Sequence, residues 1–246
     1  MGFTDHLSEL RTTMIRILLI WGVSFMICYS FGDLLADYLI KPLTDALNGE
    51  GEIVFLEIFD KVLAKFQLGF WSGIILSSPL WFYEIWKFIK PALYEKEVKV
   101  IRPFIFVGFV LFVLGVLFGY YIAFPFAFDL ILNFDISSVE EIKASINLRS
   151  YLVMFSKILL FLGLIFQLPN AMLILGFMGV VTKQSLAAMR SYVYVGFAVI
   201  AAMLTPPDPT TLLLLWVPLV ALFEVGLLAV KLIVHPYLHR KHMGES

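Results

Sequence analysis

Two carboxylates at the ends of apolar segments carry the clearest chemical signal in this sequence. Glu9 lies in the run "FTDHLSELR" at residues 3–11, directly before a long apolar stretch. Glu97 lies in "KPALYEKE" at residues 90–97, between two further apolar stretches. A carboxylate in such a place binds a guanidinium well, because the two groups form two parallel hydrogen bonds. The chemistry to expect is recognition of an arginine.

The short helix expected between Pro91 and Pro103 gives Glu97 an unusual position. At 100° per residue, one broad face collects the apolar side chains Leu93, Tyr94, Val98, Val100 and Ile101. Glu97 falls in the middle of that face, about 40° from Leu93, while Lys96, Lys99 and Arg102 lie on the other side. Burying that carboxylate is costly unless a cation meets it.

The N-terminal helix presents Glu9 differently, on its polar side. Leu7, Leu10 and Met14 form the apolar face, and Arg11 lies near its flank, where it could reach a lipid phosphate or another helix. Two kinds of partner remain open for Glu9 and Glu97. One is an arginine of this chain, namely Arg11, Arg16 or Arg102, and the other is a guanidinium from another chain.

Composition places these residues in a membrane protein. The 246 residues are 61% hydrophobic, with a mean hydropathy of +0.92, whereas soluble domains are about 45–50% apolar. A single polytopic membrane domain over residues 1–246 is therefore expected. The net charge of −1 gives no indication of a nucleic-acid partner, and the single cysteine, Cys28, cannot form a disulfide within the chain. The first apolar run lacks a signal-peptide cleavage pattern, so we expect it to be a retained span.

Six apolar runs are long enough, or nearly so, to cross a bilayer. They cover about 14–35, 66–86, 104–132, 152–178, 192–205 and 212–232. Six crossings place both termini on one side, and the segments expected on that side hold 12 of the 18 basic residues. The excess of Lys and Arg marks the cytoplasmic side, so both termini are expected on the cytoplasmic side of a bacterial plasma membrane. The fold class is an all-α integral membrane protein.

The bundle is expected to be kinked and curved. Pro79, Pro125, Pro169 and Pro218 fall within or near the ends of spans, and each should kink its helix. The fifth span is short for the hydrocarbon thickness, a pattern found near working sites in transporters. In the outer loops we expect a helix after Pro42 and a capping box at residues 137–140.

Polar side chains inside the spans are the remaining functional candidates. Lys157 and Gln167 lie on the fourth span and Glu224 on the sixth, where Glu224 needs a partner or a proton. Asp208, at the outer end of the short fifth span, could equally cap the sixth helix. Motifs of nucleotide-binding, hydrolytic and metalloprotease enzymes are absent from the sequence, so we expect neither an enzyme nor a metal or cofactor.

Several runs together resemble the TatC family, the multispanning core of the twin-arginine protein translocase. The matching runs are "HLSELR" (6–11), "FIKPALYEKE" (88–97), "YYIAFPFAF" (120–128), "FQLP" (166–169), "LTPPD" (204–208) and "LFE" (222–224). They extend through nearly the whole chain, in order. The family often has a glutamate where this chain has Gln167, and a glutamine cannot ionise.

The resemblance implies a receptor that binds twin-arginine signal peptides of folded proteins at the cytoplasmic face. Glu9 and Glu97 would meet the paired arginines, with Arg11 nearby and Phe88, Leu93 and Tyr94 flanking them. It also implies assembly with small single-span subunits of the TatA/TatB type along the fifth and sixth spans, several copies in one complex, and transport driven by the proton-motive force. The alternative is a secondary transporter of a small solute, with Lys157, Gln167 and Glu224 at a midplane site.

Overall fold

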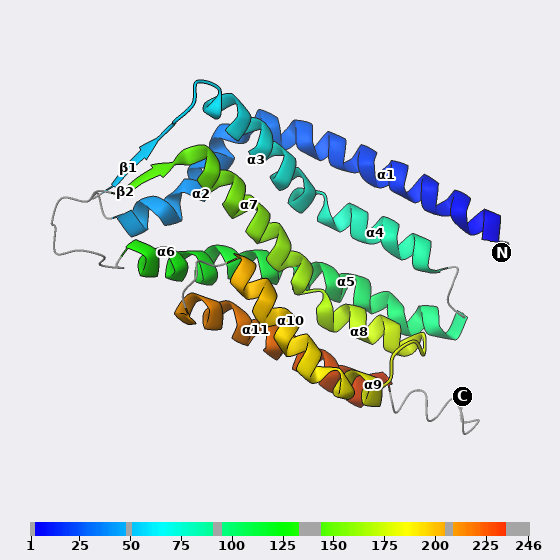
Figure 1. The fold of residues 1–246 in the computed structure, drawn as a ribbon. Helices are drawn as coiled ribbons and strands as arrows, with labels where there is room; N and C mark the ends of the chain where they lie inside the picture. Colours follow the sequence, from blue (N-terminus) through cyan, green and yellow to red (C-terminus); the bar gives the residue numbers. More distant parts are fainter. Residues whose placement is uncertain (1–2, 48–50, 91–94, 133–143, 205–208, 235–246) are drawn as a thin grey trace. The chain divides into compact units, whose positions relative to one another are not determined.

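A computed structural model describes residues 3–47, 51–90, 95–132, 144–204 and 209–234 (Figure 1). In chain order the elements are α1 (Phe3–Ser30), α2 (Gly32–Leu47), β1 (Gly51–Val54), α3 (Asp60–Leu76), α4 (Ser78–Ile89), α5 (Glu95–Phe118), the π-helix η2 (Gly119–Ala123), α6 (Phe124–Leu132), β2 (Ala144–Asn147), α7 (Leu148–Ile165), α8 (Leu168–Phe177), α9 (Lys183–Ala188), α10 (Arg190–Leu204), α11 (Pro209–Ala229) and the π-helix η3 (Val230–Val234). The expected helical membrane class is confirmed.

Among the residues that the structure describes, four helical stretches are long and apolar enough to cross a bilayer. They are Leu7–Ser30, Arg102–Phe128, Leu148–Phe177 and Pro209–Val234, which overlap the first, third, fourth and sixth predicted spans. The predicted second span, 66–86, is divided between α3 and α4, which separate at Ser77. The predicted fifth span corresponds to the shorter apolar helix Arg190–Met203.

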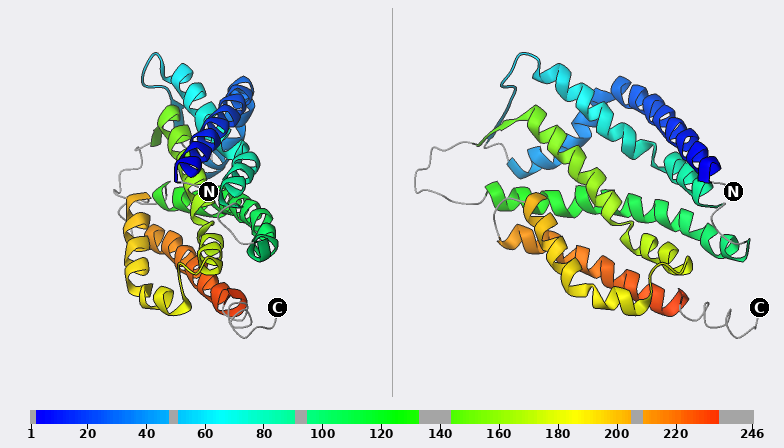
Figure 2. Two further views of the ribbon diagram at one scale, coloured as in Figure 1. Left: turned by 90° about the vertical axis from the view of Figure 1, so that its right-hand side faces the viewer. Right: turned by 45° about the vertical axis from the view of Figure 1, so that its right-hand side comes forward.

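The chain divides into two compact units, each of which we describe by itself. Unit 1 comprises residues 1–88 and 116–162, and unit 2 comprises residues 89–115 and 163–246. In unit 1, α1 and α3 lie side by side (Figure 2), and α2 packs on α6. A buried apolar core joins α2, α3, α6 and α7 and includes Leu43, Leu68, Phe124 and Phe155.

A short parallel strand pair joins two distant segments of unit 1. β1 and β2 pair from Gly51–Ala144 to Val54–Asn147. The all-helical expectation missed this pair, because each strand has only four residues and the partner lies some ninety residues away in sequence. The expected capping box at 137–140 lies outside the described residues.

Prolines interrupt the spans at most of the expected places. α4 begins just before Pro79, the π-helix η2 precedes Pro125, and α8 begins just before Pro169. α11 continues through Pro218 without a break. Pro42 lies inside α2, so the helix expected after Pro42 in fact begins at Gly32. The prediction was wrong because tertiary contacts make up for the hydrogen bond that proline removes.

Tyr120 supplies that compensation in α2. Pro42 has no N–H, so the carbonyl of Tyr38, four residues earlier, lacks its helical donor. The hydroxyl of Tyr120 donates a hydrogen bond to that carbonyl at 2.8 Å. Next to it, the hydroxyl of the buried Tyr151 donates to the carbonyl of Leu39 at 2.6 Å. Two tyrosines therefore anchor α2 to η2 and α7.

Unit 2 is built around α8 and α11. These helices approach so closely at Gly226 that a Cβ atom there would lie 2.6 Å from the sulfur of Met172 and 3.0 Å from Cα of Pro169. An alanine at this position would force the Met172 side chain to move and would press on the backbone of Pro169. Phe177, Leu219 and Phe223 are buried in the same unit.

Candidate functional site

A polar pocket of about 200 Å³ surrounds Glu9 in unit 1. Five lining residues come from α1 and one from α4: Ser8, Glu9, Thr12, Thr13, Arg16 and Lys87. Helical spacing places these α1 side chains on one face over about two and a half turns, and so they line one cavity. Glu9 is half-buried there, and its carboxylate makes no ion pair with the described residues.

A second carboxylate beside this pocket is already paired. Nη1 of Arg16 lies 3.5 Å from Oε2 of Glu84, which is on α4. The Glu84 side chain is only 13% exposed, so this carboxylate needs its cation. Arg16, one of the arginines left open as a partner of Glu9, thus serves Glu84. The sequence reasoning missed Glu84, since its partner lies 68 residues earlier in the chain.

The other residues proposed around Glu9 are placed only in part. Arg11 is exposed on α1, and Phe88 is half-buried near the end of α4. Glu97 lies in the first turn of α5, in unit 2, and its side chain is outside the described set. Leu93 and Tyr94 lie outside the described residues. Glu9 and Glu97 therefore belong to different units of the chain.

Glu224 has the partner that the sequence analysis required. Its carboxylate accepts a hydrogen bond from Nη2 of Arg190 at 2.7 Å and another from the hydroxyl of Tyr194. The indole of Trp216 donates to the carbonyl of Tyr194 at 2.8 Å, which fixes α10 against α11. Arg190 was not predicted as this partner, because the 34 residues between it and Glu224 leave no local signal in the sequence.

Gln167 lies at the break between α7 and α8. Its Nε2 donates to the carbonyl of Gly108 on α5 at 2.8 Å. Its Oε1 and the Oδ1 of Asn170 are buried and accept no hydrogen bond from the described residues. An amide group here does what an ionised carboxylate could not, because it donates to a backbone carbonyl.

The remaining polar candidates are described only in part. Lys157, in unit 1, is exposed, and its ammonium lies 5.4 Å from the ring centroid of Trp71. Asp208 lies outside the described residues. Among the residues described, no group of three His, Cys, Asp or Glu side chains could hold a metal ion.

An ion-pair network that was not predicted from the sequence lies around Asp60 in unit 1. Asp60, only 2% exposed, accepts hydrogen bonds from Nδ2 of Asn147 at 3.0 Å and from the N–H groups of Glu57 and Leu56 at 3.0 and 3.2 Å. Nη1 of Arg149 lies 3.1 Å from its second oxygen. The Asn147 hydrogen bond, with those of Glu57, Arg149 and Leu56, holds the pKa of Asp60 below its usual range despite burial. The network ties α3 to β2 and α7.

Comparison with known proteins gives one consistent result. The family model for the Sec-independent protein translocase protein (TatC) matches residues 5–218. The TatC of Desulforapulum autotrophicum is 35% identical over 93% of this chain and 84% of its own length. TatCy of Bacillus subtilis is 35% identical over 94% of the chain and 89% of its own length. TatC of Escherichia coli K12 is 31% identical over 90% and 84%.

Solved structures agree with the sequence relatives. A crystal structure of the twin-arginine translocase receptor TatC aligns with a TM-score of 0.82 and 29% identity, covering 92% of this chain and 98% of that one. A second crystal structure of the receptor, in the detergent DDM, aligns with a TM-score of 0.83. These findings give no support to a solute transporter. The chain belongs to the TatC family, and it is an integral membrane subunit of the twin-arginine translocase, not an enzyme.

Proposed function

We propose that this subunit is the receptor for twin-arginine signal peptides and that the Glu9 pocket receives one of the two arginines. The observation that carries this proposal is the contrast between two neighbouring carboxylates. Glu84 is paired with Arg16, whereas Glu9 opens into a polar pocket and makes no ion pair with the described residues. A carboxylate held in this way gains most from an incoming guanidinium, which adds charge and two hydrogen bonds.

Glu97 supplies the second carboxylate in this proposal, with Phe88, Leu93 and Tyr94 beside it and Arg11 on the flank. Support comes from the sequence, where Glu97 falls on the apolar face of its helix. Removing one partner of a buried guanidinium–carboxylate pair costs roughly 3–5 kcal/mol, which lowers affinity about a hundredfold or more. Glu97→Ala and Glu97→Gln should therefore abolish binding of the precursor while the fold persists.

The test is co-purification of the detergent-solubilised protein with a twin-arginine precursor and with a matched double-lysine precursor. The receptor should retain the first and lose most of the second, because lysine cannot form the two parallel hydrogen bonds. Equal retention of both precursors would contradict arginine recognition. Normal export by cells carrying Glu97→Ala would remove Glu97 from the site.

We also propose six spans with both termini in the cytoplasm. Twelve of the 18 basic residues support this orientation. Cys28 is the single cysteine of the chain and is buried, so once it is replaced an introduced cysteine is the only thiol that can be labelled. With Cys28→Ser as background, an impermeant maleimide should label Glu52→Cys in spheroplasts but label Gln184→Cys only after lysis. The reverse pattern would invert the topology.

The partner subunits are expected to dock on α10. Tyr192, Val195, Val199 and Met203 recur at helical spacing along one face of α10, and they are 80%, 65%, 54% and 81% exposed. The Arg190–Glu224 pair holds this helix on α11 and leaves the face free. We propose that small single-span TatA/TatB-type subunits pack here, within a complex of several copies that uses the proton-motive force. A photo-crosslinker at Val199 should form adducts with such a subunit, and one at Leu80 on α4 should not.

A further inference from the structure

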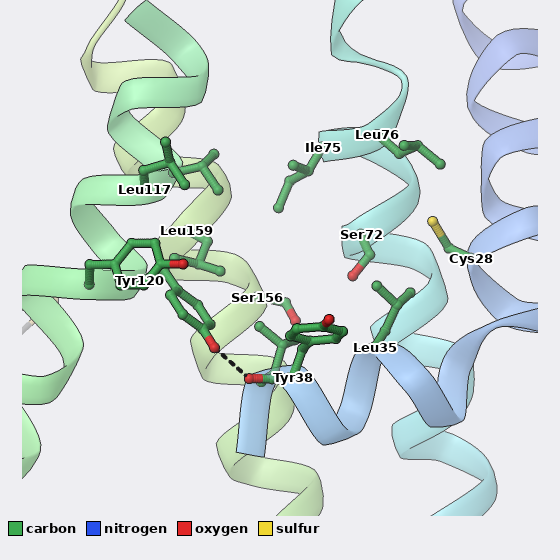
Figure 3. A pocket seen from close by; sticks show the side chains of 13 residues that line it. Cys28, Leu35, Tyr38, Ser72, Ile75, Leu76, Leu117, Tyr120, Ser156 and Leu159 are labelled. Atoms are coloured by element: carbon green, nitrogen blue, oxygen red, sulfur yellow. Dashed lines mark hydrogen bonds between the residues drawn. The ribbon is translucent and has the colours of Figure 1, made fainter. Parts of the chain in front are cut away.

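A cavity of about 400 Å³ opens inside unit 1 (Figure 3). α1, α2 and α3 form one side and α5, η2 and α7 the other. The labelled side chains that point into it are mainly apolar and include Leu35, Ile75, Leu76, Leu117 and Leu159, with Cys28 on the α1 side. All the lining residues belong to unit 1. An occupant of this cavity must therefore be apolar over most of its surface.

Two of the hydroxyl groups in the walls already have hydrogen-bond partners. Tyr120 donates to the carbonyl of Tyr38 that Pro42 leaves without a helical donor, as the dashed line in Figure 3 shows. Ser156 is only 1% exposed and donates to the carbonyl of Leu152 at 2.8 Å. These two hydroxyl groups need no hydrogen bond from a molecule in the cavity, so a hydrocarbon chain is compatible with the interior.

The open side of the cavity continues a surface that faces lipid. Leu76 and Leu117 on its rim are 54% and 43% exposed. The α1 and α5 residues that line it lie in or beside the apolar stretches Leu7–Ser30 and Arg102–Phe128, which are long enough to cross the bilayer. A space in contact with the hydrocarbon core is filled by acyl chains, because an empty gap would forfeit dispersion contacts.

Two tyrosines at the rim give the cavity a polar end. Tyr38 and Tyr121 line it and are 60% and 69% exposed. Their phenol groups combine an apolar ring with a hydroxyl, which is why tyrosine is enriched at the level of lipid headgroups. The cavity thus has an apolar interior and an amphipathic entrance, and this matches one tail of a phospholipid and its ester linkage.

We propose that this cavity is a binding site for one acyl chain of a membrane phospholipid, whose glycerol ester region lies beside Tyr38 and Tyr121. A transmembrane helix of a partner is too large for it. A helix with its side chains is about 10–12 Å wide and rises 5.4 Å per turn, so about 400 Å³ holds less than one turn. The bound acyl chain fills the space between the α1–α3 pair and α7.

Photo-labelling with a phospholipid tests the proposal. The full chain is placed in phosphatidylglycerol nanodiscs that contain a trace of phosphatidylglycerol with a diazirine in one acyl chain. After irradiation, peptide mapping should find several-fold more adducts around Leu117 and Leu76 than around Leu80 on α4, which is 54% exposed outside the cavity. Equal labelling of the cavity walls and Leu80 would show ordinary surrounding lipid and overturn the proposal.

Variants that fill the cavity provide the second measurement. Ser72→Phe and Leu117→Trp add volume from opposite walls, and each should reduce the cavity adducts at least severalfold while the adducts at Leu80 persist. Leu80→Phe is the matched control and should change neither. Monodisperse elution and a thermal transition verify that each variant is folded. Leu117→Trp is the less disruptive of the two, because the Leu117 side chain is partly exposed and lies outside the core. Unchanged cavity labelling in a folded Leu117→Trp protein would overturn the site.

Two further experiments distinguish a phospholipid from other molecules that could occupy the cavity. A free fatty acid with the same diazirine should label the cavity more weakly than the phospholipid, since it lacks the glycerol ester. Labelling by the fatty acid alone would overturn the assignment to phospholipid. A benzophenone amino acid at Leu117 should produce lipid adducts, and adducts of protein mass would show that a polypeptide fills the cavity instead.

Discussion

Nη2 of Arg190 lies 2.7 Å from Oε2 of Glu224, and this pair joins the start of α10 to the C-terminal half of α11. The two side chains are 46% and 31% exposed, so this pair is neither fully buried nor free in solvent. Tyr194 donates to the second carboxylate oxygen, which leaves both oxygens of Glu224 engaged. The ionisable group that the sequence places inside the sixth span is therefore neutralised within the chain.

Breaking this pair should destabilise the protein by about 1 kcal/mol, between the small value of exposed pairs and the 3–5 kcal/mol of buried ones. Arg190→Ala leaves a partly buried carboxylate uncompensated, and the melting temperature in detergent should fall by about 2–4 °C. The swap of Arg190→Glu with Glu224→Arg should recover part of the loss. Lys183→Ala, at an exposed residue with no ion pair among the described residues, is the control and should leave the melting temperature unchanged. A melting temperature equally unaffected by Arg190→Ala would show that the pair is not stabilising.

Stability at low pH should depend on Asp60. Its hydrogen bonds, that from Asn147 first, hold its pKa below its ordinary value of about 3.9 in the unfolded chain. The resulting stabilisation is complete above that ordinary value and is lost as the pH falls through the lower, folded pKa. Melting temperatures measured from neutral pH down to below about pH 4 should therefore drop more steeply in the wild type than in Asp60→Asn.

Asp33→Asn is the matched control for that experiment. Asp33 also pairs with a cation, Lys65, at 2.9 Å, but its side chain is 85% exposed. Exposed pairs of this kind contribute little to stability. Its substitution should leave the acid profile close to that of the wild type. A profile for Asp60→Asn that matches the wild type would contradict the role of Asp60.

The main lines of the fold could be predicted from apolar run length and proline position. Four spans appear as continuous apolar stretches, and breaks occur near Pro79, Pro125 and Pro169, where lost backbone hydrogen bonds are predictable. The helix around Pro42 was not predicted correctly, because its stability depends on the distant hydroxyl of Tyr120. The strand pair was missed for the same reason, since pairing across about ninety residues leaves no local pattern.

The candidate site was predictable in its residue types but not in its pairing. The sequence identified Glu9 as a carboxylate suited to a guanidinium and Glu224 as one that needs a partner or a proton. It could not assign Arg16 to Glu84 or Arg190 to Glu224, because 68 and 34 residues separate the partners. Helical spacing reports which side chains share a face of one helix, whereas an ion pair between two helices depends on how they pack.

Neutralising Glu9 should lower the affinity for the precursor, whereas neutralising Glu84 should lower the stability of the fold. Glu9→Gln removes the group proposed to bind a signal-peptide arginine and should weaken precursor binding about tenfold to a hundredfold, from about 1.5–3 kcal/mol for a charged hydrogen bond. Glu84→Gln releases Arg16 and should mainly lower thermal stability. Lys87→Gln removes from the pocket a positive charge that repels the incoming arginine, and it should therefore tighten binding of the precursor. Titration with a labelled signal peptide measures the three affinities, and thermal unfolding in detergent measures the stability of Glu84→Gln. Unchanged affinity in Glu9→Gln would exclude the pocket.

Gly108, Gln167 and Asn170 should show strong coupling in unit 2. A Cβ atom at Gly108 would lie 2.5 Å from Nδ2 of Asn170 and 3.1 Å from Oε1 of Gln167, so Gly108→Ala should cost about 1–3 kcal/mol by overpacking. Asn170→Ala makes room for that methyl group, and the double variant should be less destabilised than the sum of the singles.

Asn170→Leu separates packing from polarity at the same place. The Oδ1 atom of Asn170 is buried and accepts no hydrogen bond from the described residues, so replacing it by hydrocarbon of similar size removes a desolvation cost. The melting temperature should stay the same or rise. Gln167→Leu, in contrast, leaves the Gly108 carbonyl without its side-chain donor and should cost about 0.5–1.5 kcal/mol. If Asn170→Leu proved as destabilising as Gln167→Leu, the amide oxygen of Asn170 would have to accept a hydrogen bond that stabilises the fold.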